Sequence, residues 1–253
     1  MGFEYVHPRV EGSVGILTLI RPPINAINGD VLTEIMTALK EWGETESVSA
    51  VVLTGGIRNA FCTGGDIGQL FGNAMAGLGV QERRSLFLHF QDIYSWIEAY
   101  AKPTVAAING VAIGGGLELA LVCDFRVASE VAVFSMPELK HRIIPGLGAT
   151  QRLPRFIGVG RAKEMLLLGK MIRAGRALEW GLVHRVAPRT EVLDHAVALA
   201  RELGEKPASA VKVLKSCFLQ EGGIRTLHDE AEAFTELVEE RIAWELSQEG
   251  SRE

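Results

Sequence analysis

Hydrophobic positions in the first half of the chain fall into short apolar runs, with segments of helical period between them. Apolar residues recur at helical spacing from near Asn28 or Asp30 to Trp42, and again over residues 84–100. Strands that alternate with helices predict an α/β core. The runs rich in β-branched residues, which predict the strands, are 14–20, 50–54, 104–108 and 125–128.

Beyond about residue 150 the strand pattern fades and helical periods dominate. Pro188 and the Lys206-Pro207 step are plausible boundaries. We therefore expect an α/β core over residues 1–190 and a helical region over 191–253. The predicted helices are 160–168, 174–180, 191–203, 207–219 and a pattern from about 224 onward.

Composition narrows the class of protein. A chain of 253 residues can bury one sizeable core, and 47% hydrophobic with 23% charged residues is typical of soluble globular proteins. No apolar run reaches the roughly 18 residues of a membrane span, and no signal-peptide pattern opens the chain, so we expect a cytoplasmic protein without a membrane partner. Cys62, Cys123 and Cys217 form no C-x-x-C pair, which predicts reduced thiols and no disulfide or metal site.

Charge is unevenly distributed along the chain. The net charge is −5, which weakly disfavours nucleic acid as a partner. Residues 151–189 nevertheless hold nine Lys and Arg against two Glu, whereas residues 221–253 hold ten acids against three Arg. Both stretches could be solvated faces of helices. Alternatively, the basic region could bind an anionic ligand or pack against the acidic tail.

Two glutamates follow signals that shape the backbone. Glu118 comes directly after the glycine run 114–116 and Leu117, where a strand is expected to end and a helix to begin. The first N–H groups of a helix lack intrahelical partners, so a carboxylate and free donors meet there. Glu138 follows Pro137, a position more often occupied by a surface or capping acid. Two acids beside N–H donors suit proton transfer next to a carbonyl.

A second glycine motif lies upstream, in Thr63-Gly64-Gly65-Asp66-Ile67. Adjacent glycines let another group approach the main chain, although a plain turn explains them equally well. The glycines of both motifs are contiguous, and neither G-x-G-x-x-G nor a P-loop occurs, which argues against nucleotide binding. Residues 72–79 are predicted to form an ordinary surface loop.

Taken in order, these motifs resemble the enoyl-CoA hydratase/isomerase family, the crotonases. The resemblance covers most of the chain and continues more loosely over residues 177–186. It is carried by Arg21-Pro22-Pro23-Ile24-Asn25-Ala26-Ile27-Asn28, by the two glycine motifs, by Met136-Pro137-Glu138, and by Thr150-Gln151-Arg152-Leu153-Pro154-Arg155.

The resemblance implies a crotonase-like spiral of repeated ββα units with a helical C-terminal trimerisation region. Residues 1–190 would carry the acyl-CoA site and residues 191–253 would form the oligomerisation region, in a homotrimer or a dimer of trimers. The substrate would be an acyl-CoA thioester, with no metal and no cofactor other than the coenzyme A of the substrate.

Site residues are also implied by the resemblance. The N–H groups of Gly65 and Gly115 would polarise the thioester carbonyl. Glu118 would activate water and Glu138 would protonate C2, with one proton shared between the two nearby acids. The coenzyme A stretch would be lined by Gly65, Asp66, Ile67, Gly68 and Gly115.

Having both acids favours hydration of 2-enoyl-CoA to 3-hydroxyacyl-CoA in fatty-acid or related acyl-CoA degradation. An enoyl-CoA Δ3-Δ2 isomerase, which could use one acid, is the nearest alternative. A non-catalytic relative that binds acyl-CoA is a second, and RNA binding through residues 151–189 is a third.

The chain departs from the family pattern at several positions. Gly65 stands where alanine is common, Gly68 where a basic residue is common, and Ala149 where glycine is common. His141-Arg142 replaces the usual Leu-Gly, which we expect to reshape the acyl pocket or its electrostatics. The acidic C-terminal end also differs from the family pattern, in a region where the family contacts the adenine and neighbouring subunits.

Overall fold

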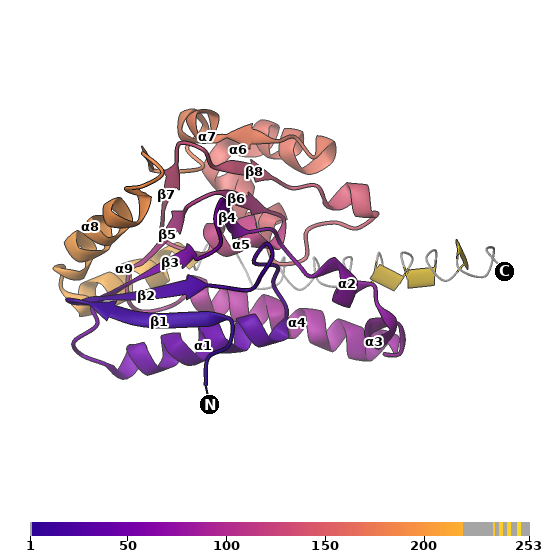
Figure 1. The fold of residues 1–253 in the computed structure, drawn as a ribbon, viewed down its shortest axis with the longest axis horizontal. Coiled ribbons are helices and arrows are strands. Elements are labelled where there is room, and N and C mark those ends of the chain that lie inside the picture. The colour runs from indigo at the N-terminus through magenta and orange to yellow at the C-terminus, as the bar shows by residue number, and fades with distance from the viewer. Residues whose placement is uncertain (1, 220–234, 236–237, 240–241, 244–246, 249–253) are drawn as a thin grey trace.

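The structure, a computed structural model, describes residues 2–219 together with Thr235 and residues 238–239, 242–243 and 247–248 (Figure 1). Two sheets and the helices around them make up this part of the chain. None of its helices combines the length and the apolar character needed to cross a membrane.

A six-stranded sheet forms the centre of the fold. All neighbouring strands run parallel except the first pair, which is antiparallel. The strands in spatial order are β1 (Val6–Glu11), β2 (Val14–Leu19), β3 (Ala50–Gly55), β5 (Thr104–Ile108), β7 (Phe125–Ser129) and β10 (Arg185–Ala187).

Both faces of the central strands β2, β3 and β5 are buried, which explains why they read as continuous apolar runs. Along β3, Ala50 and Val52 point into one hydrophobic cluster, whereas Val51 and Leu53 point into another. Helix α8 (Val192–Gly204) covers the first face, and helices α1 (Gly29–Glu44) and α4 (Val80–Glu98) cover the second (Figure 1).

A second sheet of four short strands carries the functional motifs. Its strands in order are β4 (Ala60–Cys62), β6 (Val111–Ile113), β8 (Val133–Ser135) and β9 (Ile172–Arg173), and only β9 is antiparallel to its neighbour. Each long central strand from β3 onward is thus followed by a short strand and a helix: β3 by β4 and α2 (Ile67–Leu70), β5 by β6 and α5 (Gly115–Leu121), and β7 by β8 and the 3₁₀ helix η1 (Glu138–His141). The ββα unit expected from the resemblance therefore recurs along the chain.

The four predicted strands are present, as β2, β3, β5 and β7. The short strands were not predicted, because two or three residues show no measurable period. The expectation of a surface loop at 72–79 is wrong: α3 (Asn73–Ala76) forms there and buries Met75. A glycine- and alanine-rich segment indicates flexibility in sequence, yet one apolar side chain anchors it.

Helices after residue 150 largely follow the prediction. The predicted helix at 160–168 is the second part of α6 (Ala149–Leu168), which Gly158 interrupts with a φ of 78°. The others are α7 (Ala174–Trp180), α8 and α9 (Ala208–Leu219). The pattern expected from 224 onward falls largely outside the described residues.

The expected boundary at residue 190 does not separate two independently packed parts. Val192, Ala196 and Ala200 of α8 pack in one cluster with Val52 and Val105 of the central sheet. Helix α8 therefore completes the core, and the proposed oligomerisation role of residues 191–253 stays a prediction.

Candidate active site

Three loops that follow neighbouring strands meet at one edge of the small sheet. Strands β4, β6 and β8 are parallel, so their carboxyl ends lie at the same edge. Gly65 follows β4, Gly115 follows β6, and Glu138 follows β8. The topology therefore brings together residues that are separated by up to 73 positions in the sequence.

Two backbone N–H groups lie beside each other at this edge. Ile27 bridges the first loop by donating its N–H to the Gly64 carbonyl and accepting from the Asp66 N–H, which leaves the Gly65 N–H unused by the bridge. Gly115 is the first residue of α5, so its N–H has no intrahelical acceptor. A Cβ on Gly115 would lie only 3.5 Å from the Gly65 nitrogen, and both residues line the same cavity.

Glycine is required at two positions in the second loop. Gly114 has a φ of 51°, and a Cβ there would lie 2.8 Å from the Oε1 atom of Glu138. A Cβ on Gly116 would lie 2.2 Å from the carbonyl oxygen of Cys62 on β4. The glycine run therefore allows α5 to approach both the neighbouring loop and the second carboxylate.

Glu118 is a buried carboxyl group held by two backbone donors. Its Oε1 accepts hydrogen bonds from the N–H of Leu147 at 2.9 Å and of Ala149 at 3.0 Å. Burial raises the pKa of Glu118 to about 7, although the two N–H groups and the positive charge of Arg152 oppose that rise. A carboxyl group with such a pKa can exchange protons near neutral pH.

Arg152 supports the turn that holds Glu118. Its Nη1 donates to the Leu147 carbonyl oxygen at 2.8 Å, and its Nε donates to Glu98 on α4 at 2.8 Å. Ser95, also on α4, lies 3.4 Å from the guanidinium. Arg152 therefore joins α4 to the backbone that binds Glu118.

Helix α4 also contacts the N–H pair more directly. The buried hydroxyl of Tyr94 donates to the Gly115 carbonyl oxygen at 3.0 Å. Earlier in the same helix, Leu86, Phe87 and Phe90 line the cavity. One helix thus supports the backbone donors with its second half and walls the cavity with its first half.

Glu138, the second acid, is the first residue of η1 and is 9% exposed. Its side chain reaches Gly114, the residue before Gly115, and it lines the cavity together with Glu118. The structure therefore places Glu118, Glu138, Gly65 and Gly115 around one space.

That space is a cavity of about 680 Å³. Its polar side is made by the glycine loops and the two acids. Much of its remaining lining is apolar and includes Leu32 of α1, residues of α3 and α4, and Ile143, while Asn28, Asp30, Gln69 and His141 add polar groups. Such a composition suits a ligand with one polar functional group and an apolar body.

Several residues that shape the first glycine loop were not assigned roles from the sequence. The side chain of Asn25 donates to the carbonyl oxygens of Ala60 and Phe61, and the Arg21 guanidinium pairs with Asp66 at 2.6 Å. Partial burial disfavours ionisation of Asp66, but the Arg21 and Gln69 donors outweigh it and lower the pKa of the carboxyl. Arg21 and Asn25, which belong to the early motif, thus hold the first glycine loop in place.

Asp66 has a structural task in addition to its expected place near coenzyme A. Its carboxylate accepts from the Gln69 N–H and so caps α2. Asp66 and Ile67 line the cavity, whereas Gly68 is exposed and does not. The expected coenzyme A stretch therefore borders the cavity at its start and turns to the surface at Gly68.

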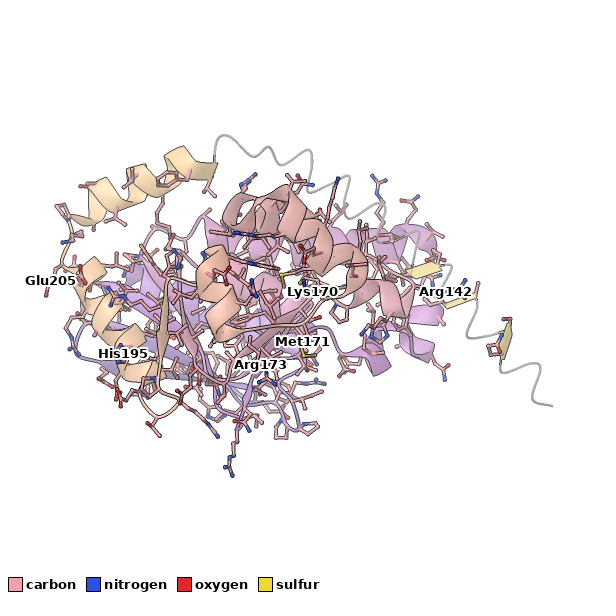
Figure 2. The ribbon with its side chains drawn as sticks, turned by 90° about the horizontal axis from the view of Figure 1, so that it is seen from above. Arg142, Lys170, Met171, Arg173, His195 and Glu205 are labelled. Carbon is pink, nitrogen blue, oxygen red and sulfur yellow. The ribbon has the colours of Figure 1, made fainter. Side chains whose placement is uncertain are left out.

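His141 and Arg142 have separate surroundings. His141 lines the cavity, whereas Arg142 is exposed at the surface and does not (Figure 2). Arg142 adopts a left-handed conformation with a φ of 61° at the end of η1, which accounts for the glycine usual at this position. Of this pair, only His141 alters the cavity lining.

Neither metal chemistry nor a disulfide adds to this arrangement within the described residues. No group of three His, Cys, Asp or Glu side chains there is placed to hold a metal ion. Cys62 and Cys123 are buried free thiols, and burial raises the pKa of each to about 12.

Two adjacent N–H donors with two carboxyl groups can stabilise negative charge on a carbonyl oxygen while protons move at neighbouring atoms. Acyl transfer, in contrast, needs an activated nucleophile. The buried thiol of Cys62 is protonated at neutral pH and is not among the cavity-lining residues.

Known proteins share both this sequence and this fold. The chain is 36% identical to crotonyl-CoA hydratase of Syntrophomonas wolfei over 238 residues, which cover 92% of this chain and 90% of the relative. It is 37% identical to the short-chain-enoyl-CoA hydratase of Clostridium acetobutylicum over 81% of this chain and 77% of that protein. The crystal structure of an enoyl-CoA hydratase from Bacillus anthracis superimposes with a TM-score of 0.79 at 33% identity, over 93% of this chain and 91% of the other.

A probable enoyl-CoA hydratase from Mycobacterium thermoresistibile gives a TM-score of 0.83 at 26% identity, over 94% of this chain and 98% of the other. These likenesses confirm the expected spiral of ββα units. The family model described as enoyl-CoA hydratase/isomerase matches residues 9–253. The chain therefore belongs to the enoyl-CoA hydratase/isomerase family.

Proposed function

We propose that this protein is an enoyl-CoA hydratase, which adds water to 2-enoyl-CoA and forms 3-hydroxyacyl-CoA. One observation carries the proposal: Glu118 and Glu138 line the same cavity as Gly65 and Gly115. Relatives named crotonyl-CoA hydratase and short-chain-enoyl-CoA hydratase support the same reaction.

In this reaction the thioester oxygen accepts hydrogen bonds from the two glycine N–H groups. Glu118 takes a proton from water as the water oxygen bonds to C3 of the substrate. The electron pair of the C2–C3 double bond then moves toward the carbonyl, and the N–H pair stabilises the resulting enolate charge. Glu138 delivers a proton to C2, which completes the addition.

The pKa of Glu118 suits its proposed role as the base. A general base works best with a pKa near the operating pH, and burial places the pKa of Glu118 at about 7. No cofactor is needed beyond the coenzyme A of the substrate.

The same proposal implies where coenzyme A binds, how the protein assembles, and in which pathway and compartment it acts. Coenzyme A would extend along Asp66, Ile67 and Gly68, and the protein would assemble as a homotrimer or a dimer of trimers through residues 191–253. A relative named as a peroxisomal fatty acid beta-oxidation multifunctional protein from Arabidopsis thaliana, 39% identical over 72% of this chain, supports a role in fatty-acid degradation. The buried free thiols favour the cytoplasm as the compartment.

The test follows the conjugated thioester absorbance of crotonyl-CoA in the presence of wild-type protein, Glu118→Gln and Glu138→Gln. We expect wild-type turnover and a loss of about 10²-fold or more in each variant. An isomerase would retain near-normal conversion of a 3-enoyl-CoA in one of the two variants. No turnover of any 2-enoyl-CoA by the wild type would refute the proposal.

A further inference from the structure

One side of the cavity is an apolar wall, which we define as Met75, Leu78, Leu86, Phe87, Phe90 and Ile143. Met75 and Leu78 come from α3 and the residues after it, and the next three come from the first half of α4. None of these six side chains carries a charge or a strong hydrogen-bonding group. A ligand group against this wall must therefore be apolar, because a polar end would lose its hydration there.

A second layer backs this wall from the C-terminal part of the chain. Val238 and Ile242 are 0% and 5% exposed, and they pack in one cluster with Met75, Phe87 and Ile143. Neither of them lines the cavity. They support the wall from behind without touching its contents.

An ion pair attaches this backing layer to α4. Arg83 pairs with Glu239, which directly follows Val238. Arg83 is 7% exposed and precedes Phe87 by one helical turn. The charge pair therefore helps hold Val238 in the cluster that contains Phe87.

From this geometry we propose that the apolar wall receives an aliphatic acyl chain longer than the crotonyl group, and that Val238 and Ile242 limit the length it accepts. The inference rests on the proposed hydratase function and specifies its substrate class. A crotonyl group ends one methyl group beyond the reacting carbons, so it would leave much of the cavity of about 680 Å³ without contacts. Each further methylene buried against the wall adds to binding.

The first measurement is kcat/KM for 2-enoyl-CoA substrates from crotonyl through octenoyl and dodecenoyl to hexadecenoyl. We expect kcat/KM to rise from crotonyl to octenoyl by up to about fourfold per methylene, and to fall at the longest chains. A value that is highest for crotonyl and declines with every added carbon would overturn the proposal.

The second measurement tests the backing layer with Val238→Ala and Ile242→Ala. Loss of this support lets the wall yield, so the ratio of kcat/KM for dodecenoyl over octenoyl should rise about fourfold, the worth of one methylene. Val159→Ala is the matched control, since Val159 is 61% exposed on α6 and lies outside the cluster. Equal ratios in the control and in both alanine variants would overturn the role of the C-terminal residues.

Glu239→Gln provides an independent variant that keeps the size of the side chain and removes its charge. It should shift the same ratio in the same direction by a smaller factor, with thermal unfolding confirming that the protein is folded. An unchanged ratio would overturn a role for the Arg83–Glu239 ion pair in chain-length selection.

Failure of the inference and failure of the proposed function are distinguishable. A protein that hydrates crotonyl-CoA but shows no preference for longer chains is a hydratase without the proposed substrate class. If no substrate is turned over, affinities for saturated acyl-CoAs of the same lengths test the wall without catalysis. Affinity that does not increase from butyryl to octanoyl would overturn the inference in that case also.

Discussion

The Tyr94 hydroxyl donates a hydrogen bond to the carbonyl oxygen of Gly115, a residue that lines the cavity. We expect Tyr94→Phe to lower the free energy of unfolding by about 1–2 kcal/mol, because a buried carbonyl loses its donor. Movement of Gly115 should also lower kcat about tenfold, since a displaced oxyanion donor stabilises charge less well. Steady-state kinetics and denaturant unfolding measure both effects.

Tyr100→Phe is the matched control for this change. Its hydroxyl donates to the Leu39 carbonyl oxygen at 2.9 Å, in the core and away from the cavity. It should lose similar stability and retain kcat. Equal kcat losses in the two variants would contradict a positioning role for Tyr94.

Stability should depend on pH through Glu118. The folded-state pKa of this carboxyl is about 7 against an ordinary value of 4.5, so between these values the folded protein keeps a proton that the unfolded chain releases. Folding stability is therefore greatest below about pH 4.5 with respect to this group, and it declines as pH rises through 7. The decline should be on the order of 3 kcal/mol.

Glu118→Gln should remove this component of the pH dependence. We expect the variant to be more stable than the wild type at pH 8 and to lose that advantage as pH approaches 4.5. Urea unfolding at a series of pH values measures the difference. A constant difference across the series would show that the Glu118 carboxyl does not titrate in this window.

Arg152 should set the pH at which Glu118 becomes active as a base. Its charge lowers the pKa of Glu118, so Arg152→Met should shift the acidic limb of the kcat profile to higher pH. Arg155→Met serves as a control, because Arg155 is exposed on the same helix. A fall in kcat of similar size at every pH would indicate loss of the Leu147 contact alone.

Alanine should have opposite effects at two glycines of the site. Gly65 does not have a positive φ, and a Cβ there meets nothing within 4 Å, so Gly65→Ala should raise stability by about 0.4–1 kcal/mol. Gly114→Ala combines a φ of 51° with a contact to Glu138, and should lower stability by about 1–3 kcal/mol. Thermal unfolding of the two variants side by side provides the comparison.

Replacement of Arg142 by glycine should stabilise the protein. A left-handed conformation costs a non-glycine residue about 1–2 kcal/mol, and the greater freedom of glycine in the unfolded chain offsets part of that gain. We expect a net increase of about 0.5 kcal/mol in the free energy of unfolding. Arg155→Gly, in a regular helical turn, should lose about 1 kcal/mol, so the two changes must differ in sign.

The central strands could be predicted because burial on both faces leaves a long apolar run in the sequence. Strands β4 and β6 could not, since each has only three residues and its identity depends on pairing with its neighbour. Glu118 and Glu138 were singled out by the glycine and proline residues before them, and the family resemblance assigned their roles. Periodicity alone would not have placed them around one cavity.

The hydrogen bonds that support the site could not be predicted from local sequence patterns. Tyr94 acts on Gly115 across 21 residues, and Arg152 reaches Glu98 across 54, so only the folded chain joins them. Met75 was missed for a different reason: its glycine- and alanine-rich neighbours indicate a loop, while its burial depends on distant side chains. These hydrogen bonds and the burial of Met75 depend on contacts between segments that are distant in the sequence.

Because α4 walls the cavity at Phe87 and supports Gly115 at Tyr94, changes in substrate range and changes in catalytic rate are not independent along this helix. An evolving or engineered enzyme that enlarges the pocket on α4 risks moving its own oxyanion donors. Val238 and Ile242 contact the wall from a separate segment. They offer a route by which substrate preference can diverge while the reaction centre is conserved.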